Sequence, residues 1–309
     1  MQTLAFRPPV QLSKLTPMNW FAVLVSLACV LALALPPDPH TLRQLHISRF
    51  EYRLAILSLL IPYIICWYAG FYVYAKLIEY TKYLKSSHEG AAFMKTTKGM
   101  GILAFGLILP TIINLILGQV AQRYTGTRYA VTIINNYIAI IFPLAALVYI
   151  SGGGRLLVGL TKTRPKFGGI QIFAAVYILL SIFYTFLVSF NYYRYHNPYH
   201  VPLIVLILTF VGPYLYLWFL GLMSAYDFKF YSINVKGVLY KRALNLFASG
   251  IALMIAGSII SQFINGSYGA RQSSIGTVLL LNYAFLVVIA AGLVMMAAGA
   301  NKLKRIEEV

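Results

Sequence analysis

Acidic residues are scarce in this chain, which contains seven aspartates and glutamates against 25 lysines and arginines. Charged residues of both signs make up only 10% of the sequence, whereas a soluble domain usually contains about 25%. Hydrophobic residues, in contrast, make up 60% of the 309 positions. This composition excludes an ordinary water-soluble domain and predicts an integral membrane protein.

Cysteines and catalytic motifs are also nearly absent. The two cysteines, Cys29 and Cys66, both lie within long apolar runs, which excludes a framework of disulfides. No Asp, Glu, Lys, Arg or His lies in the middle third of any apolar run, although proton relays and voltage sensors rely on such residues. The sequence also lacks the H-E-x-x-H pattern of zinc metalloproteases. We therefore expect no cofactor, and a non-catalytic protein is favoured over an enzyme.

The apolar residues are gathered into long runs. A hydrocarbon core about 30 Å thick requires about 20 residues of helix to cross it. Because lipid offers the backbone no hydrogen bonds, runs of this length are expected to be helices. Eight such runs are present: Met18–Leu35, Leu54–Leu77, Met100–Val120, Val131–Gly152, Gly169–Phe190, Pro202–Ala225, Leu244–Ile264 and Gly276–Ala300. The sequence therefore predicts an all-α integral membrane protein with eight transmembrane helices.

The basic residues are distributed unevenly over the connections between these runs. Every lysine lies in the two terminal segments or in or beside the second, fourth and sixth connections, whereas the other connections carry only arginines. Under the positive-inside rule this asymmetry places both termini in the cytoplasm, with the chain in the cell membrane. The basic loops would then lie against anionic lipid headgroups. The net charge of +18 is therefore attributed to the bilayer, and no nucleic-acid partner is expected.

Two parts of the chain are similar to each other. The pattern P-Y-x-x-x-W-x-x-G occurs at residues 62–70 and again at 213–221, a separation of 151 residues. An Asn-Tyr pair at 136–137 recurs at 282–283, a separation of 146 residues. Between these patterns, Gly101 aligns with Gly250 at a separation of 149. We therefore expect a tandem duplication of a four-helix unit, with residues 1–155 and 156–309 as its two copies.

The number of helices in each copy determines how the copies are related. Four crossings return the chain to the side on which it started, so both copies begin on the same side of the membrane. The halves are then parallel repeats related by a pseudo-two-fold axis along the membrane normal. A cleft between the halves is the expected place for a solute path.

The duplicated polar and aromatic residues are the candidates for ligand binding. These candidates are Asn136, Tyr137, Asn282, Tyr283, Trp67, Trp218, Tyr63 and Tyr214. Their side chains would form two hydrogen-bonding walls that face a shared path. The alternative interpretation is that they hold the helices together, since polar contacts between membrane helices contribute about 0.6 kcal/mol each.

Four histidines lie on the expected outer side of the membrane. They are His40, His46, His196 and His200. Imidazole is a common ligand of zinc and copper, so these histidines are weak candidates for a metal site. However, Pro198 argues against a helical pair of ligands between the last two. A position at the membrane interface, beside several tyrosines, is the favoured interpretation.

Three functions remain open from the sequence. The first is a channel or carrier for an uncharged, amphipathic or lipid-like solute, because the repeated halves contain no buried charge. The second is a sensory or accessory module that binds a ligand or a membrane-protein partner, or that forms a homo-oligomer. The third is an enzyme that modifies lipids at the interface, for which only Glu79, Glu89 and Asp227 provide acid–base groups on the inner side.

Overall fold

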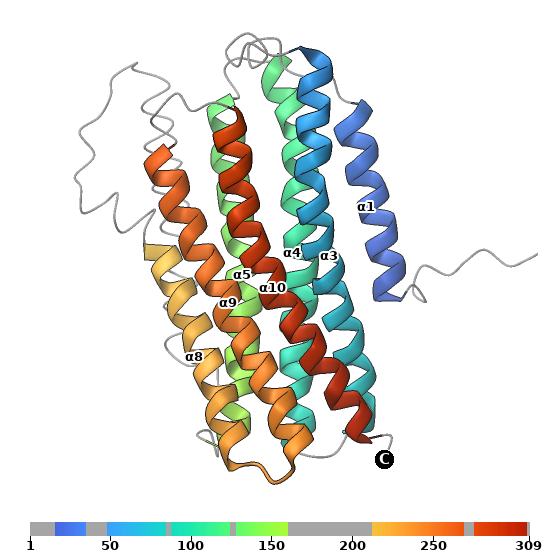
Figure 1. Ribbon diagram of the computed structural model, residues 1–309, viewed down its shortest axis with the longest axis vertical. Coiled ribbons are helices and arrows are strands. Elements are labelled where there is room, and N and C mark those ends of the chain that lie inside the picture. The colour runs from blue at the N-terminus through green and yellow to red at the C-terminus, as the bar shows by residue number, and fades with distance from the viewer. Residues whose placement is uncertain are drawn as a thin grey trace, which may run out of the picture.

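The computed structural model describes residues 16–34, 48–84, 88–123, 128–159, 212–268 and 275–307. Within these ranges the chain forms seven α-helices that lie side by side in an elongated bundle (Figure 1). The helices are α1 (Pro17–Ala34), α3 (Arg49–Tyr83), α4 (His88–Arg123), α5 (Arg128–Val158), α8 (Gly212–Asn234), α9 (Val238–Tyr268) and α10 (Ile275–Glu307). The all-α class expected from the sequence is therefore confirmed for the described residues.

Six of these helices are long and apolar enough to cross a membrane: α1, α3, α4, α5, α9 and α10. They overlap six of the eight expected runs. Helix α8 overlaps only the second half of the expected run 202–225, and the expected run 169–190 lies outside the described residues. By the length and hydropathy of its helices the chain is a multi-pass membrane protein. The number of eight crossings and the cytoplasmic position of the termini stay predictions.

Five of the helices, α3, α4, α5, α9 and α10, are longer than the apolar runs that predicted them. Helix α3 begins several residues before the run 54–77, at a capping box formed by Ser48 and Glu51. The Ser48 hydroxyl accepts a hydrogen bond from the Glu51 backbone N–H at 3.1 Å, and the Glu51 carboxylate accepts one from the Ser48 N–H at 2.7 Å. Such a cap contributes about 1 kcal/mol to a helix. Polar capping thus extends the helix beyond its apolar segment.

Neighbouring helices pack in two similar groups. In one group α3 contacts α4 and α4 contacts α5, and in the other α8 contacts α9 and α9 contacts α10. The groups meet where α3 packs against α10, which we call the α3–α10 seam, and where α5 packs against α8, the α5–α8 seam. Helix α1 packs against α3 and α4 at the edge of the bundle (Figure 1).

One end of the bundle carries the short connection between α8 and α9, at the bottom of Figure 1. We call it the basic end, because exposed basic side chains occupy it. These include Lys82, Lys98, Lys229, Lys236, Lys241 and Arg242. Helices α3 and α5 end there and α4 begins there, so the corresponding helices of both groups run in the same direction.

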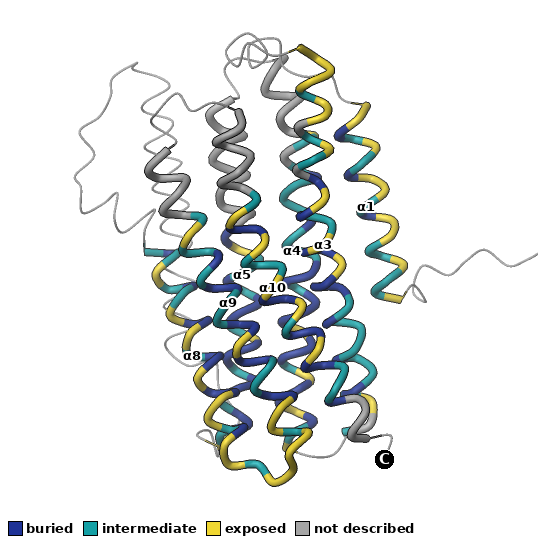
Figure 2. Tube along the Cα trace, viewed as in Figure 1, coloured by how far each residue is buried: buried dark blue, intermediate teal, exposed yellow. Residues whose placement is uncertain are grey.

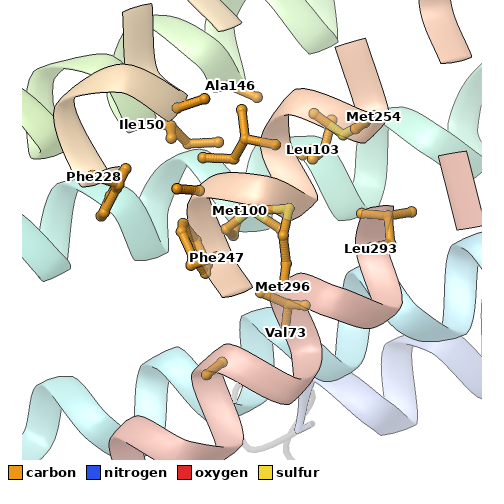
Figure 3. Packing of buried hydrophobic residues seen from close by; sticks show 14 of the residues in the cluster. Val73, Met100, Leu103, Ala146, Ile150, Phe228, Phe247, Met254, Leu293 and Met296 are labelled. Atoms are coloured by element: carbon orange, nitrogen blue, oxygen red, sulfur yellow. The ribbon is translucent and has the colours of Figure 1, made fainter. Parts of the chain in front are cut away.

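A single apolar core joins both groups. Its buried members come from α3, α4, α5, α8, α9 and α10, and buried residues, drawn in dark blue, are gathered in the middle of the bundle in Figure 2. Near the centre Met100, Leu103, Met254, Leu293 and Met296 pack together (Figure 3). Methionine is flexible and fills irregular space between helices. Apolar side chains therefore occupy the region between the groups.

Helix α1 is bound to the bundle by a narrow stripe. Its buried residues Leu24, Ala28 and Ala32 are spaced four apart, which places them on one face of the helix. They belong to a second apolar cluster that also contains Trp67 and Phe71 of α3. The other faces of α1 expose large apolar side chains, as expected of a helix that is surrounded by lipid.

Glycines allow the closest helix contacts. A Cβ added to Gly153 of α5 would lie 2.2 Å from Thr96 Oγ1 and 2.7 Å from the Ala92 carbonyl oxygen of α4. A Cβ added to Gly299 of α10 would lie 2.7 Å from the Ala243 carbonyl oxygen of α9. Small residues permit such approach in membranes, where helix association depends on packing and not on the hydrophobic effect.

Replacement of Gly153 by alanine should therefore destabilise the protein. The added methyl would meet the backbone of α4 and force α4 and α5 apart, at a cost of about 1–3 kcal/mol. Gly152→Ala is the matched control, because the nearest atom to its Cβ would be Lys95 Cδ at 3.8 Å. Thermal unfolding in detergent micelles should show a lower midpoint for Gly153→Ala only. Equal midpoints for the two variants would contradict the close contact.

Candidate functional site

Most side chains of the site predicted from the Asn-Tyr pairs lie outside those that the structure describes. Asn136 and Tyr137 lie within α5 and Asn282 lies within α10, but their side chains fall outside the described set. The four outer histidines, His40, His46, His196 and His200, also lie outside the described residues. Both the hydrogen-bonding walls and the metal site therefore stay predictions.

Tyr283 is the member of these pairs whose side chain is described. Its hydroxyl donates a hydrogen bond to the backbone carbonyl of Ser58 on α3. Further along the same seam, the Cys66 thiol of α3 lies 3.6 Å from the Leu286 carbonyl oxygen of α10. The Tyr283 hydroxyl thus joins α10 to α3 across the α3–α10 seam, which is the packing role considered as the alternative.

The two duplicated tryptophans make matching contacts. Trp67 of α3 is fully buried, and its Nε1 donates to the Leu107 carbonyl oxygen of α4 at 2.8 Å. Trp218 of α8 donates from Nε1 to the Ser258 hydroxyl of α9 at 3.3 Å. The polar atom of each indole therefore has a protein partner and links adjacent helices.

A tyrosine packs beside each of these tryptophans. The rings of Tyr63 and Trp67 have centroids 5.9 Å apart, and those of Tyr214 and Trp218 have centroids 6.3 Å apart. Both pairs are tilted rather than stacked. The four residues thus occur as two similar aromatic pairs, each beside an indole hydrogen bond. Whether they bind a ligand stays a prediction.

Asp227 is the residue that stands out in the structure. It lies on α8 just beyond the predicted run 202–225, yet it is only 1% exposed. Its Oδ2 atom has no hydrogen-bond partner within the described part of the chain. A buried polar atom without a partner costs free energy, and a functional role or a bound ligand is a common reason for its presence, so Asp227 is the strongest candidate for a functional group.

Asp227 is buried because it lies on the face of α8 that packs against other helices. Leu217, Leu220 and Ser224 precede it on that face at helical spacing. The facing residue on α5 is Gly154, where an added Cβ would lie 3.0 Å from Asp227 Cβ. The absence of a side chain at Gly154 therefore lets α5 cover the carboxylate at the α5–α8 seam.

Burial changes the acidity of this group. Loss of hydration raises the pKa of Asp227 from 3.8 to about 6, and the nearby charge of Arg155 on α5 acts in the opposite direction. No ion pair between the two is present among the described residues, where the ion pair found joins Lys76 to Glu79. Asp227 is thus a carboxyl group that can take up and release a proton near neutral pH.

Other buried polar groups on α8 do have partners. The Ser224 hydroxyl donates to the Leu220 carbonyl oxygen at 2.7 Å. The Ser232 hydroxyl lies 2.6 Å from Asn245 Oδ1 of α9 and 2.6 Å from the Lys229 carbonyl oxygen. These contacts contrast with the unpartnered Oδ2 of Asp227 in the same helix.

A second polar cluster joins the two groups of helices at the basic end. The Tyr231 hydroxyl of α8 donates to the Glu89 carboxylate in the first turn of α4. Burial, followed by the hydrogen bond to Glu89, raises the pKa of Tyr231, so this phenol stays protonated and acts as a donor. His88 contacts the Leu156 carbonyl oxygen of α5 instead. Glu89 and His88 are adjacent in sequence but serve different contacts, which gives no acid–base pair for catalysis.

Metal binding finds no support among the described residues. No group of three His, Cys, Asp or Glu side chains lies close enough together to hold an ion in that part of the chain. Comparisons with known proteins identify no relative, because no protein-family model, curated protein or solved structure matches the chain. Any functional assignment must therefore rest on the geometry of the helices and of Asp227.

The buried carboxylate should make stability depend on pH. Because the pKa of Asp227 is higher in the folded state than in the unfolded state, folding favours its protonated form. The free energy of unfolding should therefore rise as the pH falls from about 6 to about 4, by about 3 kcal/mol for a shift of this size, and stay constant above pH 6. Asp227→Asn should remove this slope and unfold at a higher temperature at neutral pH.

Thermal unfolding in detergent across this pH range measures the effect. Glu79→Gln is the matched control, since it also removes a carboxylate, but from a partly exposed ion pair. The control should keep the slope of the wild-type protein. A slope that persists in Asp227→Asn would show that another group causes it.

Proposed function

We propose that the chain is a carrier for an uncharged, amphipathic or lipid-like solute, formed by two parallel four-helix halves at residues 1–155 and 156–309. The observation that carries the proposal is the pair of equivalent seams between the two groups of helices. At the α3–α10 seam, the second helix of the first half meets the last helix of the second half. At the α5–α8 seam, the last helix of the first half meets the second helix of the second half. A two-fold axis along the bundle would produce this arrangement.

Equivalent contacts within the two groups support the duplication. Gly70 of α3 lies against Ala104 of α4, and Gly221 of α8 lies against Ile255 of α9. Both members of the second contact lie 151 residues after those of the first. The indole hydrogen bonds described above obey the same separation. Helices α3 and α8 also end 151 residues apart, at residues 83 and 234.

The third helices follow this register too. A Cβ on Gly99 would lie 2.7 Å from the Ala146 carbonyl oxygen, and a Cβ on Gly250 would lie 2.5 Å from the Gly292 carbonyl oxygen. Gly99 and Gly250 are 151 residues apart, whereas the sequence comparison paired Gly250 with Gly101. The contacts favour a constant separation through two helices, which then changes to 146 for the last helix. Helix α9, with 31 residues, is five residues shorter than α4, with 36 residues, so a single shortening of this helix explains both values.

The packed centre favours a carrier over an open channel. Met100, Met254 and Met296 fill the region between the halves, and these apolar side chains leave the halves in direct contact (Figure 3). Passage of a solute would require the halves to move relative to each other, as in alternating access. Gly154 is a small residue at the α5–α8 seam, and small residues suit such a movement.

The chemistry of the interior indicates the class of solute. Apolar residues dominate the core, and the middle thirds of the apolar runs carry no ionisable side chain. A charged solute would lose its hydration in such an interior without gaining a partner. An uncharged or amphipathic molecule avoids most of this cost.

Transport can be measured in vesicles reconstituted with the full chain. We expect faster flux of glycerol, or faster exchange between leaflets of a fluorescent short-chain phospholipid, than in empty vesicles. Simultaneous replacement of Asn136 and Asn282 by alanine should lower this rate, because both amides are expected on the path. Asn234→Ala is the matched control, since Asn234 is exposed at the end of α8.

The same preparation distinguishes the carrier from the accessory module. Rates equal to those of empty vesicles for both probes would contradict the carrier. If a stoichiometric membrane-protein partner then copurified from native membranes, the sensory or accessory function would be favoured. Flux that is unchanged in the double variant would remove the two asparagines from the path while leaving the carrier in place.

A further inference from the structure

We propose that Asp227 is a proton-binding site that loads when the α5–α8 seam closes and unloads when the seam opens. The ligand is a proton taken from water at the basic end, and the carboxylate becomes a neutral carboxylic acid on binding it. Opening of the seam returns the proton to water. The inference concerns one seam of the bundle and does not require a transported solute.

The geometry of the seam supports this role. Asp227 is 1% exposed, its Oδ2 has no hydrogen-bond partner in the described part of the chain, and α5 covers it through Gly154. A carboxylate in such a place has lost its hydration without gaining a donor, which favours the protonated form. Movement of α8 away from α5 would restore water to the group and favour the charged form.

Helices α5 and α9 pack against α8, and each carries basic residues that could compensate the charge of Asp227. From α5, Arg155 is the charged group whose field acts on Asp227, and it opposes protonation. From α9, Lys241 and Arg242 are exposed to solvent. On α8 itself, the Lys229 ammonium donates to Asn245 Oδ1 at 3.1 Å. The described surroundings therefore weaken the effect of burial but do not cancel it.

The second seam carries a different charge at the corresponding position. In the register proposed above, Lys76 of α3 corresponds to Asp227, and Ala300 of α10 corresponds to Gly154. The Lys76 ammonium forms an ion pair with Glu79 at 3.1 Å and lies over the Tyr72 ring. One seam thus has a cation with partners, and the other has a carboxylate without one. The difference assigns proton binding to the α5–α8 seam alone.

Infrared difference spectroscopy on the full-length protein in phosphatidylcholine vesicles tests the proposal. The stretching band of a protonated carboxyl group should appear as the pH falls, with a midpoint at about 6. Asp227→Asn should remove this band. The variant also identifies the band, because the other described carboxylates remain in place.

Two further variants test the role of the seam. Gly154→Ala should displace Asp227 and change its hydration, because the added Cβ would lie 3.0 Å from Asp227 Cβ and 3.6 Å from Oδ2, and the midpoint should therefore shift from the wild-type value. Arg155→Gln should raise the midpoint, because it removes the positive charge that opposes protonation. Gly152→Ala on the same helix should leave the midpoint unchanged, since its Cβ would meet nothing closer than 3.8 Å.

The outcomes separate the alternatives. A wild-type band with a midpoint near 4, or no band sensitive to Asp227→Asn, would overturn the proton site. A midpoint that stays fixed in both Gly154→Ala and Arg155→Gln would overturn the dependence on the seam. Because Arg155→Gln adds no volume, it keeps the test valid if Gly154→Ala fails to fold. None of these readouts depends on flux, so they remain informative if the carrier proposal fails.

Discussion

The close approach of helix backbones at glycine is the contact on which the rest of the bundle depends. Lipid is as apolar as the helix surfaces, so burial of side chains against one another gains little, and packing must hold the helices together. Gly153 brings α5 against α4, and Gly299 brings α10 against α9. These contacts fix the two groups, and the fixed groups then meet along the two seams. Gly154 likewise allows α5 to approach α8 closely, and this contact excludes water from Asp227.

Much of the helical framework could be predicted from apolar length alone. Six helices coincide with expected runs because a span has a physical minimum length. The ends could not be predicted in this way, since polar caps such as Ser48 extend the helices. The residue-by-residue alignment of the two predicted repeats was also harder to predict than the presence of the helices. Sequence identity paired Gly101 with Gly250, whereas the contacts favour the pairing of Gly99 with Gly250, since both of these glycines lie against a carbonyl oxygen of the next helix.

The candidate site was the least predictable part. Asp227 lies beyond an apolar run, a position that predicts a solvated side chain, and burial there depends on a glycine in a distant helix. The sequence did contain one signal, the helical spacing that continues from Leu217 and Leu220 to Asp227. The duplicated tryptophans were predicted to bind a ligand, which stays a prediction, and in the structure their indole nitrogens donate to partners in neighbouring helices. In the proposed register Lys76 stands at the position that matches Asp227, so the buried carboxylate lies where the two predicted halves would differ.

The equivalence of the two halves is the central claim, and thermal unfolding of three alanine variants tests it most directly. Gly99→Ala and Gly250→Ala place a Cβ against the backbone of the next helix, at 2.7 Å and 2.5 Å from a carbonyl oxygen. Gly101→Ala places it 2.9 Å from the ring of Tyr74, which can rotate away. We expect similar, large decreases in midpoint for the first two variants and a smaller decrease for the third. A decrease for Gly101→Ala that equals that for Gly250→Ala, with little effect of Gly99→Ala, would contradict it.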